Sequence, residues 1–276
     1  MDFLSHFTRI TALLLALVIH SLAWSADWDS SGQDKHLSVD VILERVKESK
    51  QEAMGEESVY RYIREAKIFD LKPDGSIRKK TTKTYQAYTD GSDQELLEIN
   101  GKPASERDRA KDRAHNLERQ QKFLHRQSGQ DSEQDDLMAK NMDLFRDKFL
   151  ATLKGEELHR DRMAYVIDLK PNRAHKLENR FVDRLMNEVY ATVWVDKKEF
   201  RVSKLEMKLN EQVSFLGGFA GLLRDIRLDV HQKQLAPKLW VDDRITAYFD
   251  VRVFFKTYRF KMESQSRDFR LIEREK

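Results

Sequence analysis

Residues 188–209 read EVYATVWVDKKEFRVSKLEMKL, and this stretch decides the fold. Its first part has apolar residues at every second position, which is the period of a β-strand. These residues are Val189, Ala191, Val193 and Val195. Asp196 to Lys198 is a polar turn, and on the returning strand the parity of the apolar residues changes between Val202 and Leu205. We therefore expect a hairpin with a β-bulge near Ser203 or Lys204, a feature that bends strands in curved sheets.

The alternation continues as far as Phe269 and is one-sided. Apolar residues take every second position, and charged residues such as Arg227, Asp229 and Lys261 take the positions between them. This pattern is typical of an antiparallel sheet with one buried and one solvated face. The turns are short and contain no helical period, which argues against a parallel sheet.

The preceding residues predict more strands and two helices. Strands are expected over 60–71, 77–88, 96–99, 149–158 and 163–169, and the turn signals between them include Lys72-Pro73-Asp74-Gly75. Apolar residues at helical spacing predict a helix over 37–53, with Ser38 at its N-cap, and a short helix over 181–186.

The number of strands limits the architecture. We expect about 11 strands, and strongly twisted open sheets of that size curl or split. An uncovered apolar face would also promote aggregation. The predicted fold is mainly β with helices: a curved antiparallel half-barrel whose apolar face the helices cover.

A charged segment interrupts the strands. Ser105 and Asp108 have the spacing of a capping box, almost every residue from there to His125 is polar or charged, and a second helical face runs from Leu137 to Phe145. The apolar seam is narrow. We interpret 104–145 as a solvated helical hairpin inserted into a single domain over 37–276. Replacing Ala104–Ser132 by a short linker is then expected to cost little stability.

The N-terminus has the pattern of an export signal. Arg9 precedes an apolar run over 12–19, and Ala23-Trp24-Ser25 offers small residues at the two positions that a signal peptidase reads. We predict a signal peptide over 1–25, cleaved near Ser25, and a polar linker over 26–36. The chain contains no cysteine, which excludes lipidation of an N-terminal cysteine and disulfides. The expected product is a soluble, exported periplasmic protein.

Composition and motifs exclude several kinds of chemistry. Lys and Arg (50) nearly balance Asp and Glu (47), so nucleic acid is not an expected partner. The histidines lack paired metal-ligand spacing, and the sequence has neither a Gly-x-Ser-x-Gly elbow nor a cysteine nucleophile. We predict no enzyme activity, no catalytic residue, no metal and no cofactor. A hydrolase is the third-ranked alternative.

A glycine-rich stretch, Gly217 to Gly221, has neither the lysine nor the helix context of a phosphate loop. Its apolar neighbours indicate a flexible loop, which we place at the mouth of a cavity and represent by Phe215, Phe219 and Leu222. Two readings of the loop stay open: it packs over the cavity, or it touches a membrane or a partner.

Four short motifs, in this order and spacing, resemble a known family. They are Phe69-Asp70-Leu71-Lys72-Pro73-Asp74-Gly75, Ile99-Asn100-Gly101-Lys102-Pro103, Val193-Trp194-Val195-Asp196-Lys197 and Leu239-Trp240-Val241. Together with the signal peptide, they resemble the LolA/LolB-like periplasmic lipoprotein-carrier superfamily, and more closely an exported bacterial branch of it concerned with outer-membrane lipoprotein sorting. The resemblance implies a half-open antiparallel barrel with helices over an apolar cavity that holds acyl chains. Without a cysteine to lipidate, the chain resembles the soluble carriers.

The predicted function is therefore to bind a hydrophobic ligand, either a lipid or the acyl chain of a lipidated protein, as a carrier or chaperone. The alternative is an envelope sensing protein of the RseB type that binds a protein partner without transport. Membrane contact is expected to be peripheral at most. The predicted cavity residues are Leu205, Met207, Leu209, Ile226, Leu228, Val230, Ile245, Ala247, Phe249, Tyr258, Phe260 and Met262.

Overall fold

A computed structural model describes residues 37–53, 58–91, 93–114, 147–215 and 221–272. The predicted signal peptide, the linker over 26–36 and the predicted second helix of the charged segment lie outside these residues.

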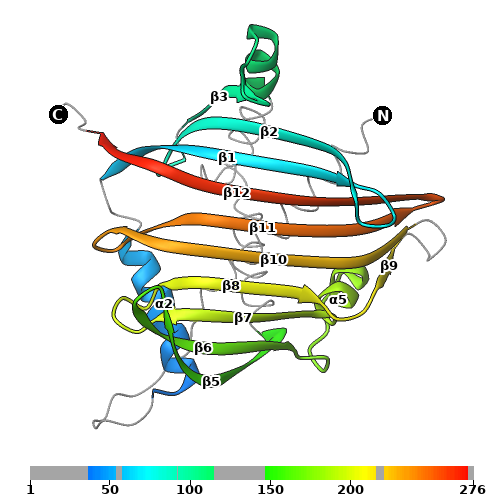
Figure 1. Ribbon diagram of the computed structural model, residues 1–276. Coiled ribbons are helices and arrows are strands. Elements are labelled where there is room, and N and C mark those ends of the chain that lie inside the picture. Colours follow the sequence, from blue (N-terminus) through cyan, green and yellow to red (C-terminus); the bar gives the residue numbers. More distant parts are fainter. Residues whose placement is uncertain (1–36, 54–57, 92, 115–146, 216–220, 273–276) are drawn as a thin grey trace, which may run out of the picture.

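The described strands form one open, antiparallel, curved sheet of 12 strands (Figure 1), so the predicted fold class is confirmed. The strands are β1 (Val59–Leu71), β2 (Ile77–Tyr88), β3 (Gln94–Ile99), β4 (Lys102–Pro103), β5 (Phe149–His159), β6 (Arg162–Pro171), β7 (Val189–Asp196), β8 (Val202–Leu209), β9 (Val213–Phe215), β10 (Gly221–Ala236), β11 (Leu239–Val253) and β12 (Lys256–Ile272). Two helices are α2 (Val39–Ala53) and α5 (Arg180–Met186), and residues 106–114 are also helical.

The predicted hairpin and its bulge are confirmed in β7 and β8. Trp194 pairs with Lys204 and Val195 pairs with Val202, so Ser203 is the extra residue on β8. The Ser203 hydroxyl is buried and donates to the Trp194 carbonyl over 3.2 Å, which satisfies a polar group that the bulge brings inside. The bulge therefore keeps both apolar sets of this hairpin on one face.

The order of the strands could not be predicted. It is β4-β3-β2-β1-β12-β11-β10-β8-β7-β6-β5, with β9 paired to β10 beside this path. The first and last long strands, β1 and β12, pair from Val59 with Ile272 to Asp70 with Phe260. β4 and β5, which follow one another in the chain, are thus the two outer strands, and the segment between them has to link opposite edges of the sheet.

The start of the charged segment packs on the sheet. Ala104 is buried in a small cluster with Tyr85 and Leu96. As the capping box predicted, Ser105 accepts a hydrogen bond from the Asp108 backbone N–H (3.2 Å). Residues 104–114 are therefore docked against β2 and β3 at their beginning. The sequence pattern had indicated a mainly solvated segment whose narrow apolar seam can lean on a partner.

Candidate functional site

The predicted cavity residues all lie in the main hydrophobic cluster of the protein. We call them together the apolar face. Those on β8 and β10, with Ala247 and Phe249 of β11, are buried, whereas Ile245, Tyr258, Phe260 and Met262 are half-buried. The side chains are therefore packed most completely under β8, β10 and β11, and least completely along β12.

Strand register arranges this face in rows that cross the sheet. Met207 pairs with Leu228, Leu228 with Ala247, and Ala247 with Met262. In a neighbouring row, Phe249 pairs with Phe260, and their rings stack with centroids 4.9 Å apart. Because paired residues share a face, each row is a continuous apolar path across four or fewer strands.

Two helices contribute to the cluster at opposite ends of the strands (Figure 1). From α2, Ile42, Leu43 and Val46 are buried in it, and from α5, Leu185 and Met186 are buried in it. Both helices were expected to cover the apolar face, and the structure places both against it. Among the strands, α2 lies against β5 and α5 lies against β9.

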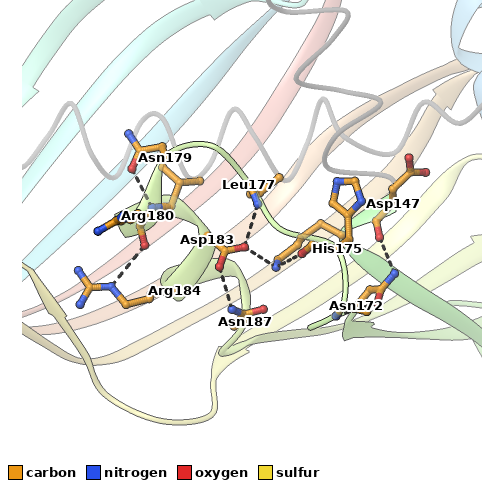
Figure 2. Close-up of polar contacts among 12 residues, drawn as sticks. Asp147, Asn172, His175, Leu177, Asn179, Arg180, Asp183, Arg184 and Asn187 are labelled. Atoms are coloured by element: carbon orange, nitrogen blue, oxygen red, sulfur yellow. Dashed lines mark hydrogen bonds and ion pairs between the residues drawn. The ribbon is translucent and has the colours of Figure 1, made fainter.

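A buried charge pair positions α5 (Figure 2). The Lys148 ammonium group, whose side chain is fully buried, donates to Asp183 over 2.7 Å and to the His175 carbonyl over 2.6 Å. Asp183 also accepts from the Leu177 backbone N–H over 3.0 Å. Burial raises the pKa of Asp183, but the hydrogen bonds from Lys148 and Leu177 outweigh it, so the pKa lies below its usual value. The Asp183 carboxylate is thus charged, and its ion pair with Lys148 connects α5 to the residue that precedes β5.

The helix has a second local anchor. The side-chain oxygen of Asn179 accepts from the backbone N–H groups of Phe181 and Val182, over 3.0 and 3.1 Å, and caps the N-terminus of α5. A seven-residue helix is too short to be stable alone, so the cap and the charge pair are needed to place Leu185 and Met186 in the apolar cluster.

Two of the three predicted mouth-loop residues, Phe215 and Leu222, lie on the paired strands β9 and β10. Phe215 is the last residue of β9, and Leu222 is half-buried in β10, where it pairs with Ser214 and Arg252. Phe219 lies outside the described residues. Strand β10 therefore begins at Gly221, inside the stretch that the sequence indicated as a loop.

The face that carries the apolar rows continues as a polar surface on β1 and β2. Ile245 pairs with Ser264, Ser264 with Ala66, and Ala66 with Lys83. Lys83 lies 3.4 Å from Asp112 and pairs with Ile99 of β3, so a cation lies within this row. The same face is thus mainly apolar on the β11 side of β12, whereas on the β1 side charged side chains lie beside the small apolar cluster of Tyr85 and Leu96.

Three further polar residues of this face were missed by the sequence analysis: Tyr62 and Arg64 of β1 and Asp242 of β11. Asp242 accepts from Gln232 over 2.8 Å, and burial raises its pKa despite that hydrogen bond and the charge of Arg64. Burial also raises the pKa of Tyr62, and the charge of Asp242 raises it further against the opposing charge of Arg64. The period-two pattern of β1 contained this signal, because Tyr62 and Arg64 share the parity of Ala66.

A cavity among the described residues lies away from the apolar face. Its volume is about 260 Å³, and it is lined by Arg61, Tyr62, Ile63, Gln86, Asp268 and Arg270 of β1, β2 and β12. None of the predicted cavity residues lines it. The apolar face is packed within the core, so a ligand would have to separate side chains that contact one another here.

Two histidines that are far apart in the sequence come together. The rings of His159 and His231 stack with centroids 5.6 Å apart. Burial lowers the pKa of each ring. Among the described residues, no group of three or more His, Asp or Glu side chains could hold a metal ion, and no helix is long and apolar enough to span a membrane.

No protein-family profile and no curated protein matches the sequence. Solved structures do match. A domain assigned to outer-membrane lipoprotein sorting from Vibrio parahaemolyticus is 14% identical, with a TM-score of 0.29, over 81% of this chain and 91% of that domain. A LolA superfamily protein from Nitrosomonas europaea is 13% identical, with a TM-score of 0.31, over 87% and 96%.

A chain of the MucA/MucB complex of Pseudomonas aeruginosa is 9% identical, with a TM-score of 0.24, over 82% of this chain and 93% of that one. The LolA superfamily that the sequence motifs resemble is thus among the structural matches. Because the identities and TM-scores are low, function has to be inferred from this chain's own residues.

Proposed function

We propose that this protein binds one acyl chain of a lipid or a lipidated protein on the apolar face, and that it acts in the periplasm as a carrier or chaperone. The observation that carries the proposal is the arrangement of the apolar rows. They cross β8, β10, β11 and β12 without a charged interruption, and they become half-buried along β12.

The incomplete burial along β12 suggests where the ligand enters. Tyr258, Phe260 and Met262 pack against the main cluster but keep part of their surface uncovered. An acyl chain that slides between these residues and the rows behind them would gain contacts at the smallest loss of existing packing. Its polar head would then lie toward the polar surface of β1 and β2.

The energy of such binding comes from apolar burial. Each buried methylene contributes about 0.8 kcal/mol, so a chain of roughly a dozen contributes near 10 kcal/mol before ordering costs. The proposed binding needs no ion pair. Affinity for a fatty acid should therefore change little with salt concentration.

The test is displacement of a fluorescent fatty acid from the folded protein, together with native mass spectrometry of the protein as purified. Met262→Asp puts a charge on the half-buried part of the apolar face and should weaken binding more than tenfold. Gln265→Asp is the matched control, because Gln265 is exposed on the same strand at the opposite parity. A folded wild-type protein without copurified lipid or saturable binding at micromolar probe would contradict the proposal.

A second candidate, binding of an envelope protein partner, is favoured by the edge strand β5. Among the described strands, β5 pairs with β6 alone, and Leu150 and Leu158 are exposed on it. A free strand edge can accept an extended peptide as an added strand. A stable protein complex that copurifies without lipid, and that Leu150→Lys disrupts, would support this function instead of the first.

A further inference from the structure

The turn between β11 and β12 consists of two phenylalanines. Val253 pairs with Lys256, so Phe254 and Phe255 alone connect the strands. Phe255 is fully exposed and Phe254 is 61% exposed. Two-residue turns normally use Asn, Asp or Gly, which adopt positive φ at little cost. Phe254 has a φ of 51°, a conformation that bulky residues rarely adopt.

This turn is therefore unusual in two respects: its phenylalanine side chains are exposed, and the backbone of Phe254 has a positive φ. Two aromatic rings are held in water at the tip of a hairpin, and one of them has a strained backbone. Asparagine or glycine would relieve the strain and remove the exposed apolar surface, so turn stability does not explain the phenylalanines. Such outliers point to a role in binding.

Basic side chains lie at the same end of the sheet as the tip. Lys256 follows it directly and is exposed. The β1–β2 turn lies at the same end of the sheet (Figure 1), where Arg259 of β12 donates to the Pro73 carbonyl. That turn and the start of β2 add Lys72 and Lys79, both exposed.

Two acidic side chains at this end are paired with arginine. Asp250 forms an ion pair of 2.5 Å with Arg259, and Asp70 lies 3.7 Å from Arg78. Asp74 accepts hydrogen bonds from Ser76. The lysines thus give this end of the sheet a surplus of positive charge next to the exposed rings.

We propose that the Phe254–Phe255 turn inserts into the surface of an anionic lipid bilayer, with the neighbouring lysines on the lipid head groups. Exposed Phe beside Lys is the composition of interfacial membrane anchors, and each Lys near an anionic surface contributes about 1 kcal/mol. Two phenylalanines bury roughly 300–500 Å². A specific protein–protein interface buries at least about 1,200 Å². The smaller area of the two rings fits reversible insertion into a membrane surface better than a stable protein complex.

The experiment is cosedimentation of the full chain with vesicles of phosphatidylglycerol and phosphatidylcholine, compared with vesicles of phosphatidylcholine alone. We expect binding to the anionic vesicles that weakens as salt rises. Phe255→Ser should lower the bound fraction at least tenfold and leave fatty-acid displacement unchanged. Leu158→Ser is the matched control, since Leu158 is 63% exposed but lies on β5, away from the tip.

Insertion can also be observed directly. Phe255→Trp should shift its emission to shorter wavelength on anionic vesicles and be quenched by brominated lipid. Equal vesicle binding by wild type and Phe255→Ser would overturn the proposal. The proposal would also be overturned if the wild-type protein did not bind vesicles but crosslinked to a protein through this turn. Neither result bears on fatty-acid binding, so this proposal and the proposed function can fail separately.

Discussion

The two sides of the sheet have the same strand geometry but different interiors. Strands β5 to β11, the apolar wing, bury one large cluster that both helices complete. Strands β1 to β4, the polar wing, bury few side chains: a small cluster of Tyr85 and Leu96 with Ala104, and in addition Val59 and Ala87. Their other residues are half-buried or exposed, and many of them are charged. The apolar wing is thus held by its core. The polar wing depends on its backbone ladder and on its pairing with β12.

A matched pair of leucines measures this difference. Leu228 of β10 and Leu96 of β3 are each 3% exposed, one in the large cluster and one in the small. Leu→Ala substitutions in cores cost about 2–5 kcal/mol, and the cost rises with the cavity left behind. We expect about 4 kcal/mol for Leu228→Ala and about 2 kcal/mol for Leu96→Ala, because the small cluster can collapse. Urea unfolding measures both, and equal costs would contradict the comparison.

Asp183→Asn tests the charge pair that positions α5 in the apolar wing. It leaves the Lys148 ammonium group buried without a counter-ion, and we expect a loss of about 3 kcal/mol in the free energy of unfolding. Lys148→Met with Asp183→Asn should recover part of that loss, since no buried charge remains. A loss below 1 kcal/mol, about the value of an exposed pair, would show that the pair is dispensable.

The same pair should make stability depend on acid. The pKa of Asp183 in the folded protein lies below its ordinary value of 3.8. Its contribution is therefore complete above the unfolded pKa and is lost as pH falls through the folded one. Wild type should lose stability below about pH 4 more steeply than Asp183→Asn. Thermal unfolding between pH 2.5 and 6 measures this, and parallel curves would exclude the assignment.

The smallest effect is expected at the polar wing. Tyr85→Phe removes the hydroxyl group that donates to Asp112 over 3.3 Å and should cost about 1 kcal/mol. Hydrogen exchange should then increase in β2 and β3 but not in β8 or β10. A uniform increase across the sheet would show that the wings unfold as one unit.

Most of the strands were predictable because their pattern is local. The alternation of Val189 to Leu209 predicted the β7–β8 hairpin and its bulge at Ser203, and the parity of the apolar residues predicted which side chains gather in one cluster. A three-residue strand such as β9 is too short to show a period. The docking of Ala104 was also missed, because a single alanine in a charged segment carries no pattern.

The remaining features depend on contacts between distant residues. The pairing of β1 with β12 joins two strands that are far apart in the sequence, and no local pattern encodes it. Lys148 and Asp183 are two of many charged residues in the sequence, and only the fold selects them as partners. The strand order also changes the expectation for the charged segment, because β4 and β5 lie at opposite edges of the sheet and this segment connects them. Replacing Ala104–Ser132 should therefore cost more than the sequence pattern indicated.

The most direct test of the central claim is to map where an acyl chain lies. A palmitate with a photoreactive diazirine on its tail should label peptides of β8, β10, β11 and β12, at residues of the apolar face such as Met207 and Met262, and excess unlabelled palmitate should abolish the labelling. Labelling that is not competed, or that falls on the polar wing or the β5 edge, would contradict binding on the apolar face.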